Sequence, residues 1–118
     1  MNNIDILIID DEIKFVDMLS KRLALRGISC AKCYDGNSGL QWIKEHPDFA
    51  GIILLDLRLP DIYGTQVLAG LKKINPSIPV FIITGHGSQK DKDECMELGA
   101  VEFIHKPISI DKIIALRK

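Results

Sequence analysis

Long hydrophobic runs are absent from this sequence, since no apolar stretch approaches the roughly 20 residues that a helix needs to cross a bilayer. The first residues, Met1 to Asp5, also lack the basic and then apolar layout of a signal peptide. We therefore expect a cytoplasmic protein without membrane contact. An excess of one charge is lacking too: 15 Lys and Arg stand against 16 Asp and Glu, a net charge of −1. A nucleic-acid-binding domain normally carries a basic face, so we expect no direct nucleic acid binding by this chain.

Cysteine is scarce, and the three cysteines (Cys30, Cys33 and Cys95) cannot all pair within the chain, which fits a reducing compartment. Cys30 and Cys33 form a Cys-x-x-Cys motif, which can indicate a redox or metal site. The motif lies within residues 28–34, which are typical of a strand, and residues three apart on a strand face opposite sides. No second Cys or His pair completes a zinc site. We therefore interpret both cysteines as packing residues.

What the sequence does contain is an alternation of short β-branched runs and helical patterns. The expected strands span residues 4–9, 28–34, 51–55, 79–83 and 101–104, and the expected helices span 12–26, 37–46, 65–74, 88–98 and 109–118. The first, third and fourth runs are apolar almost without a break, as in strands covered on both faces of a parallel sheet. Strands that alternate with helices predict an α/β fold with helices on both faces. We expect one domain with a flavodoxin-like, doubly wound sheet of five parallel strands, order 2-1-3-4-5, and five helices.

Polar residues stand where the expected strands end, which is where ligands bind in such a fold. Asp10 and Asp11 follow the first strand, Asp56 follows the third, Thr84 follows the fourth, and Lys106 comes after the fifth. Each alone has an ordinary explanation, such as an acid at a helix N-terminus or a solvated lysine. Clustered carboxylates, however, repel by about 4 kcal/mol per close pair at an intermediate dielectric. Such a cluster needs a cation, and hard oxygen ligands suit Mg²⁺.

Bound Mg²⁺ and a nearby lysine would attract phosphate, and a central carboxylate could then act as a nucleophile and form an acyl phosphate. Asp56 is the best candidate, because the third strand lies between the first and the fourth in the expected order. The hydroxyl of Thr84 and the ammonium of Lys106 would hold the phosphoryl oxygens.

Four stretches of the chain match a known family. They are Ile8–Glu12, Leu55–Gly64, Ile83–Gly87 and Phe103–Pro107. With them the chain resembles the receiver domain of bacterial two-component response regulators over essentially its whole length, and the third stretch looks most like receivers of the NtrC and FixJ type. The set of four in this order is highly specific, whereas any one alone would be weak. The resemblance implies a CheY-like fold and a phosphoprotein of phosphorelay signal transduction.

The resemblance also implies roles for the acids at the strand ends. Asp56 would be the phosphoacceptor and a metal ligand, Asp11 would bind Mg²⁺ directly, and Asp10 would bind it mainly through water. The backbone carbonyl of Arg58 would be a further metal ligand. The family uses the position of Arg58 to tune hydrolysis of the phosphoryl group, so a charged side chain there could shield or steer the attacking water.

A switch is implied by the same resemblance. Lys106 would contact the phosphoryl group, and its bond to Pro107 would be cis, which is cheap for an X–Pro bond. Thr84 would move toward the phosphoryl group and Phe103 would swing inward, without the hydroxyl that a tyrosine would bring. The surface of the fourth helix, fifth strand and fifth helix would then change its partner, which could be an output domain, an effector protein or a second copy of the chain.

Three rival functions fit these residues less well. A Mg²⁺-dependent phosphatase of the haloacid-dehalogenase type needs a second Asp two residues after the nucleophile, where this chain has Arg58. A flavodoxin-like electron carrier needs a phosphate loop after the first strand, and Asp10 and Asp11 would repel that phosphate. An unphosphorylated docking module would not need the intact set of acids, Thr84 and Lys106.

We therefore expect a switch that a sensor histidine kinase phosphorylates, and not an enzyme beyond its own phosphorylation and dephosphorylation. Residues 1–118 would form one receiver domain. We expect it to be the N-terminal part of a longer protein, with a stand-alone receiver or a hybrid-kinase receiver as alternatives.

Overall fold

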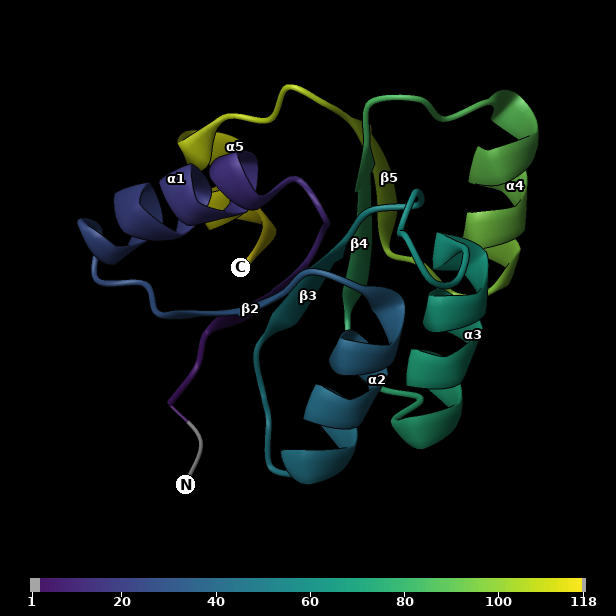
Figure 1. Ribbon diagram of the computed structural model, residues 1–118, viewed down its shortest axis with the longest axis horizontal. Coiled ribbons are helices and arrows are strands. Elements are labelled where there is room, and N and C mark those ends of the chain that lie inside the picture. Colours follow the sequence, from purple (N-terminus) through teal and green to yellow (C-terminus); the bar gives the residue numbers. More distant parts are fainter. Residues whose placement is uncertain (1–2, 118) are drawn as a thin grey trace.

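A parallel sheet of five strands forms the middle layer of the computed structural model, which describes residues 3–117 (Figure 1). The strands are β1 Ile6–Ile9, β2 Cys30–Cys33, β3 Ile52–Leu55, β4 Val80–Thr84 and β5 Glu102–His105. They lie in the order β2-β1-β3-β4-β5, and every neighbouring pair is parallel. The predicted order and direction of the strands are confirmed.

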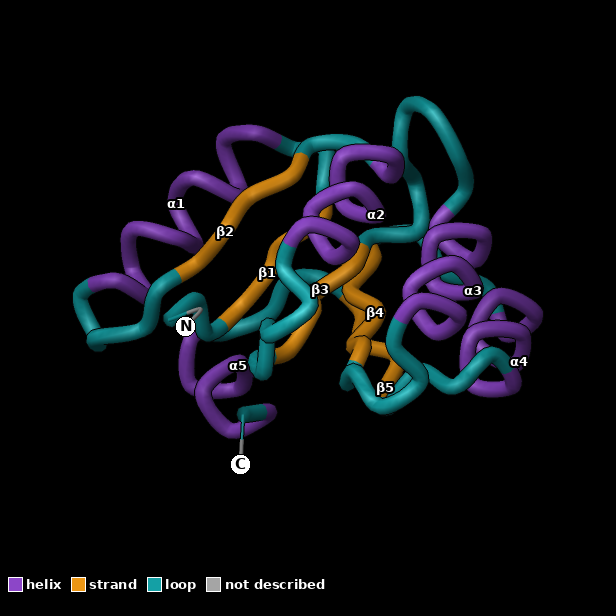
Figure 2. Tube along the Cα trace, turned by 90° about the horizontal axis from the view of Figure 1, so that it is seen from below, coloured by secondary structure: helices purple, strands orange, loops and turns teal. Residues whose placement is uncertain are grey.

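Within residues 3–117, five helices cover the two faces of this sheet. They are α1 Ile13–Ala24, α2 Gly36–Glu45, α3 Gly64–Ile74, α4 Gln89–Glu97 and α5 Ile110–Leu116. Seen from below, α1 and α5 lie on one side of the strands and α2, α3 and α4 on the other (Figure 2). Lys118, the last residue of the fifth predicted helix, lies outside the described residues.

Three helices, α1, α4 and α5, are slightly shorter than predicted because the predicted ranges include their capping residues, whereas α2 begins and ends one residue earlier and α3 begins one residue earlier than predicted. The hydroxyl of Ser88 accepts the backbone N–H of Asp91 at 3.1 Å, and the side chain of Asp91 accepts the N–H of Ser88 at 3.0 Å, a complete capping box. Gly27 ends the α1 segment at φ +76°, a conformation that a glycine adopts without strain. These local signals set where the helices begin and end.

Alternate residues of the central strands supply two separate hydrophobic layers. In β1, Leu7 and Ile9 pack beneath α2 and α3, whereas Ile6 and Ile8 pack beneath α1 and α5. All four are at most 1% exposed, because helices cover both faces of the strand. This double burial is the reason that the sequence of β1 is apolar without alternation.

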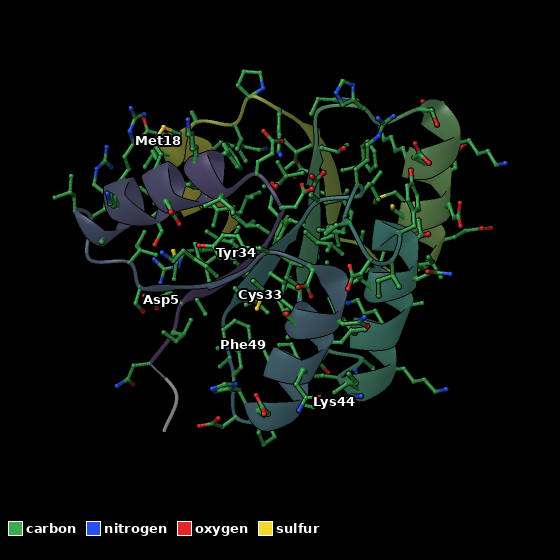
Figure 3. All side chains as sticks on the ribbon, viewed as in Figure 1. Asp5, Met18, Cys33, Tyr34, Lys44 and Phe49 are labelled. Atoms are coloured by element: carbon green, nitrogen blue, oxygen red, sulfur yellow. The ribbon has the colours of Figure 1, made fainter. Side chains whose placement is uncertain are left out.

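The Cys-x-x-Cys motif is divided between these two layers. Cys33 packs with Phe49 in the layer under α2, while Cys30 borders the opposite layer (Figure 3). All three cysteines are free. Packing on a strand is thus confirmed as the role of the motif. No helix within residues 3–117 is long and apolar enough to span a membrane.

One apolar residue of α1 lies outside the buried stripe of the helix. Val16, Leu19 and Leu23 are buried, but Met18 is 41% exposed. The buried positions recur every three to four residues along one stripe of the helix, and Met18 lies beside that stripe.

Truncation of a buried leucine should show how much the layer under α3 contributes to stability. We expect Leu68→Ala to lower the free energy of unfolding by about 2–5 kcal/mol, because Leu68 is 0% exposed and its removal leaves a cavity. The matched control is Leu25→Ala, since Leu25 is 86% exposed and its truncation should change stability by less than about 0.5 kcal/mol. Urea unfolding measures both, and equal losses would contradict this view of the core.

Candidate functional site

The register of the sheet places Asp10 beside Asp56. Ile9 at the end of β1 pairs with Leu55 at the end of β3, and the backbone N–H of Asp56 donates to the carbonyl of Ile9 at 2.9 Å. The next residue on each strand is therefore an acid at the same rim. Carboxylate oxygens of Asp10, Asp11 and Asp56 all lie within 4.8 Å of one another. Asp10 is 3% exposed and Asp56 is 6% exposed, while Asp11 is exposed to solvent.

Lys106 supplies the positive charge at this rim. Its Nζ lies 2.7 Å from Oδ2 of Asp10, 2.7 Å from Oε1 of Glu12 and 3.7 Å from Oδ2 of Asp56. The ammonium also lies 4.5 Å from the centre of the Phe15 ring on α1, a cation–π contact. The ammonium is therefore bound more closely by Asp10 and Glu12 than by the predicted phosphoacceptor.

The chain that carries Lys106 is fixed to the end of β4. The backbone N–H of Lys106 donates to the carbonyl of Thr84 at 2.8 Å, and the Lys106–Pro107 peptide bond is cis, as predicted. Lys106 thus enters the site from the rim formed by β4 and β5.

Burial and crowding of like charges dominate the electrostatics of the two buried acids. Burial raises the pKa of Asp56, and the neighbouring charge of Asp10 raises it further, against the opposing effects of Lys106 and the backbone N–H groups of Arg58 and Leu57. Burial also raises the pKa of Asp10, although its bonds from Lys106 and from the backbone N–H of Glu12 act in the other direction. Neither carboxylate is fully compensated by the protein.

The pKa of Lys106 moves the opposite way from that of an isolated buried lysine. Burial alone would lower this pKa, but hydrogen bonds to Asp10 and Glu12, together with the charges of Asp10 and Asp56, raise it overall. The ammonium is held in its charged form by the acids around it.

A divalent cation fits this set of donors. Three carboxylates bring hard oxygen atoms to one place, and a single ammonium cannot neutralise them. Asp11 is exposed, so the site opens to solvent and leaves room for water ligands. The carbonyl of Arg58 stays a predicted ligand.

The two predicted switch residues lie together behind this rim. Thr84 is 1% exposed, and its hydroxyl accepts the backbone N–H of His86 at 3.3 Å. Phe103 is 9% exposed and belongs to the hydrophobic layer under α4. A Cβ atom on Gly87 would collide with the Phe103 ring, so the ring lies directly against the backbone of the loop between β4 and α4. Phe103 is packed inward in this structure, and its predicted movement stays a prediction.

Two neighbours of Lys106 were not singled out by sequence reasoning. Glu12 reads as an extension of the acid pair at a helix start, and Phe15 reads as one more apolar residue of α1. The position of Glu12 directly after Asp11 is only a weak signal of a role in the site. The spacing of Phe15 does not distinguish it from the core residues of α1.

Comparison with known proteins identifies the family. Residues 6–118 match the response regulator receiver domain. The chain belongs to this family. The predicted resemblance is confirmed, and the protein is a receiver domain of two-component response regulators.

Relatives of this receiver include a longer regulator. The chain is 32% identical over 114 residues to the transcriptional regulatory protein ZraR of Escherichia coli K12. The aligned region covers 97% of this chain and 25% of ZraR. The receiver therefore spans about a quarter of the length of this relative.

Two solved receiver structures illustrate the match in fold. The receiver domain of NtrX from Brucella abortus is 31% identical, with a TM-score of 0.83 over 95% of this chain and 93% of that one. The CheX–CheY–BeF3–Mg complex of Borrelia burgdorferi is 25% identical, with a TM-score of 0.86 over 95% of this chain and 84% of that chain.

Neutralising Asp56 should stabilise the protein when no divalent cation is present. A carboxyl group whose pKa is raised in the folded state stabilises the fold at low pH, and this stability is lost as the pH rises above the ordinary value of 3.8. At pH 7 the charge of Asp56 therefore costs stability, and we expect Asp56→Asn to raise the free energy of unfolding by on the order of 1 kcal/mol.

Urea unfolding of the protein in a chelating buffer measures this effect. Asp93→Asn is the control, because Asp93 is an exposed acid of α4 whose side chain meets only that of Gln89 in the described contacts. Added Mg²⁺ should stabilise the wild type more than Asp56→Asn. A lower stability of Asp56→Asn without metal would show that the buried charge is already compensated.

Proposed function

We propose that this receiver accepts a phosphoryl group on Asp56 with Mg²⁺ bound beside it, and that this reaction controls a binding surface. One observation carries the proposal: Asp56 is a buried carboxylate whose oxygen lies within 4.8 Å of those of Asp10 and Asp11 and 3.7 Å from Nζ of Lys106. A nucleophile, a set of metal-binding oxygens and a cation for the phosphoryl group are thus present together.

Each residue would have a defined part in the transfer. A carboxylate oxygen of Asp56 attacks the phosphorus of a phosphohistidine on a sensor histidine kinase, the new O–P bond forms, and the P–N bond breaks as the imidazole leaves. Asp10, Asp11, Asp56 and the carbonyl of Arg58 would hold Mg²⁺, which when bound neutralises charge on the phosphoryl oxygens.

Lys106 would stabilise the transferred group after this step. Its ammonium can exchange the contact with Glu12 for one with a phosphoryl oxygen, because Glu12 is exposed and readily solvated. Thr84 would bind another phosphoryl oxygen, and Phe103 would fill the space behind it.

The output would be a change of the surface formed by α4, β5 and α5. This surface would control an output domain, an effector or a homodimer, and the chain would catalyse only its own phosphorylation and dephosphorylation in the cytoplasm. The Borrelia CheY structure with BeF3 and Mg supports the chemistry, and the length of ZraR supports a receiver that belongs to a longer regulator. A stand-alone receiver and a hybrid-kinase receiver are the alternatives.

Phosphorylation by a small donor tests the proposal directly. The protein is incubated with Mg²⁺ and acetyl phosphate, and its intact mass is measured. We expect one phosphoryl adduct on the wild type, none on Asp56→Asn and none when Mg²⁺ is removed by a chelator. The exposed acid variant Asp93→Asn should take the adduct normally. An unmodified wild type under these conditions would favour a docking module instead.

The side chain at position 58 should affect how long the phosphoryl group survives. Arg58 is exposed and stands two residues after Asp56, so its charge can shield or steer the attacking water. We expect Arg58→Ala to change the dephosphorylation half-life by about threefold or more, with Lys92→Ala on the exposed side of α4 as a control. An unchanged half-life would assign Arg58 to the surface alone.

A further inference from the structure

The loop between β3 and α3, residues 57–63, begins at the proposed phosphoacceptor and returns to it. The backbone N–H of Gly64 donates to the carbonyl of Leu57 at 2.7 Å. A Cβ atom on Gly64 would lie 2.5 Å from Cα of Leu57 and 2.7 Å from the carbonyl oxygen of Asp56, so only a glycine fits there. Both ends of the loop therefore lie against the backbone of Asp56.

One side of this loop is fixed to the N-terminus of α2. The carboxylate of Asp61 accepts the backbone N–H of Gly36 and that of Asn37, each at 2.8 Å, and also the N–H of Ile62 at 2.9 Å. The N–H groups of Gly36 and Asn37 have no partner within the helix, so Asp61 caps α2 although it lies 25 residues from Gly36 in sequence. The middle of the loop is held in place.

The other side of the loop contacts α4 through one side chain. The hydroxyl of Tyr63 donates to Oδ1 of Asp91 at 3.2 Å. Oδ2 of Asp91 accepts the backbone N–H of Ser88, and the hydroxyl of Ser88 accepts the N–H of Asp91. Tyr63 is therefore bonded to the same carboxylate that caps α4.

The electrostatics of Asp91 agree with this geometry. The backbone N–H of Ser88 is the largest cause that lowers the pKa of Asp91, and the Ser88 side chain, the Tyr63 hydroxyl and the charge of Arg58 lower it further. Two residues of the loop, Arg58 and Tyr63, thus favour the charged form of the capping carboxylate.

Little else holds the first turn of α4. Of the side chains that the structure describes in this helix, Cys95 alone is buried, and it lies in the second turn. The first six residues are Gln89-Lys90-Asp91-Lys92-Asp93-Glu94, all polar. A helix end with so few apolar contacts opens easily, and one hydrogen bond is then a large share of what holds it.

We propose that the hydrogen bond between Tyr63 and Asp91 couples the loop after the phosphoacceptor to the first turn of α4. The inference rests on the proposed function and adds two positioning residues to it. The Asp56 carboxylate interacts with the backbone N–H groups of Leu57 and Arg58, which begin the loop. A phosphoryl group on that carboxylate rearranges these bonds, and the change reaches Tyr63 through the bond between the carbonyl of Leu57 and the backbone N–H of Gly64, the residue after Tyr63. Tyr63 then passes the change to Asp91 in the first turn of α4.

Hydrogen exchange at the amides of Asp91 and Lys92, which donate to the hydroxyl and the carbonyl of Ser88, tests this coupling when it is measured with and without acetyl phosphate and Mg²⁺. In the wild type, phosphorylation should change their exchange. Tyr63→Phe keeps the ring and removes the hydroxyl, so we expect faster exchange of these amides before phosphorylation, by roughly twofold to tenfold. We also expect the change upon phosphorylation to fall to less than about half of that in the wild type.

The other tyrosine of the chain provides a matched control. The hydroxyl of Tyr34 donates to Asp17 at 2.8 Å between β2 and α1, on the opposite side of the sheet from α4 (Figure 3). Tyr34→Phe removes the same kind of bond, yet it should leave the exchange of α4 and its response to phosphorylation as in the wild type.

A double-mutant cycle distinguishes the effect of the hydrogen bond between Tyr63 and Asp91 from a general destabilisation of the helix. In the background of Asp91→Ala, which removes the acceptor, Tyr63→Phe should have no further effect on the exchange of α4. Intact mass measured on the same samples reports whether the adduct has formed.

The outcomes distinguish this inference from the proposed function. If the wild type takes no adduct, the proposed function fails and the coupling with it. If Tyr63→Phe takes the adduct and its α4 responds as in the wild type, the proposed function stands and the coupling is overturned. If phosphorylation of the wild type leaves the hydrogen exchange of the α4 amides unchanged, the coupling is also overturned.

Discussion

The rest of the site depends on one constraint, which is that two carboxylates are buried side by side with a single ammonium to balance them. Because Ile9 pairs with Leu55, the next residues of the two strands, Asp10 and Asp56, lie side by side. Lys106 meets Asp10 and Glu12 at 2.7 Å and Asp56 only at 3.7 Å. The site therefore keeps an excess of negative charge, which a bound cation can neutralise. Burial of this charge destabilises the fold, and the hydrophobic burial of the neighbouring strands offsets that loss.

The parts that could be predicted from the sequence are those that backbone rules determine. Parallel strands read as unbroken apolar runs, and ligands bind where such strands end, so Asp10, Asp56 and Thr84 could be placed at one rim before any coordinates. The capping role of Ser88 and the turn at Gly27 follow from equally local rules. Helix ends differed by one or two residues: α1, α4 and α5 are shorter because their predicted ranges included the capping residues, and α2 and α3 begin one residue earlier than their patterns indicate.

The parts that could not be predicted are contacts between side chains distant in sequence. Lys106 reaches Glu12 across 94 residues, and Tyr63 reaches Asp91 across 28. No periodicity or spacing encodes such a pair, because its formation depends on the direction in which each side chain leaves its loop. Met18 shows the same limit within one helix, since a rotation of about 100°, one residue, separates it from the buried Leu19.

The inward position of Phe103 bears on how such a switch can work. Gly87 carries no Cβ atom, and the ring of Phe103 fills the space that one would occupy, beside the methyl group of Thr84. The packing of the ring against this loop therefore depends on the missing side chain at position 87. A phosphoryl group that draws Thr84 toward itself would act by stabilising the arrangement in which the ring fills this space, since a ligand shifts an equilibrium only by its preference for one of two states. The structural requirement for this is a glycine at position 87, where any larger residue would compete with the ring for the same space.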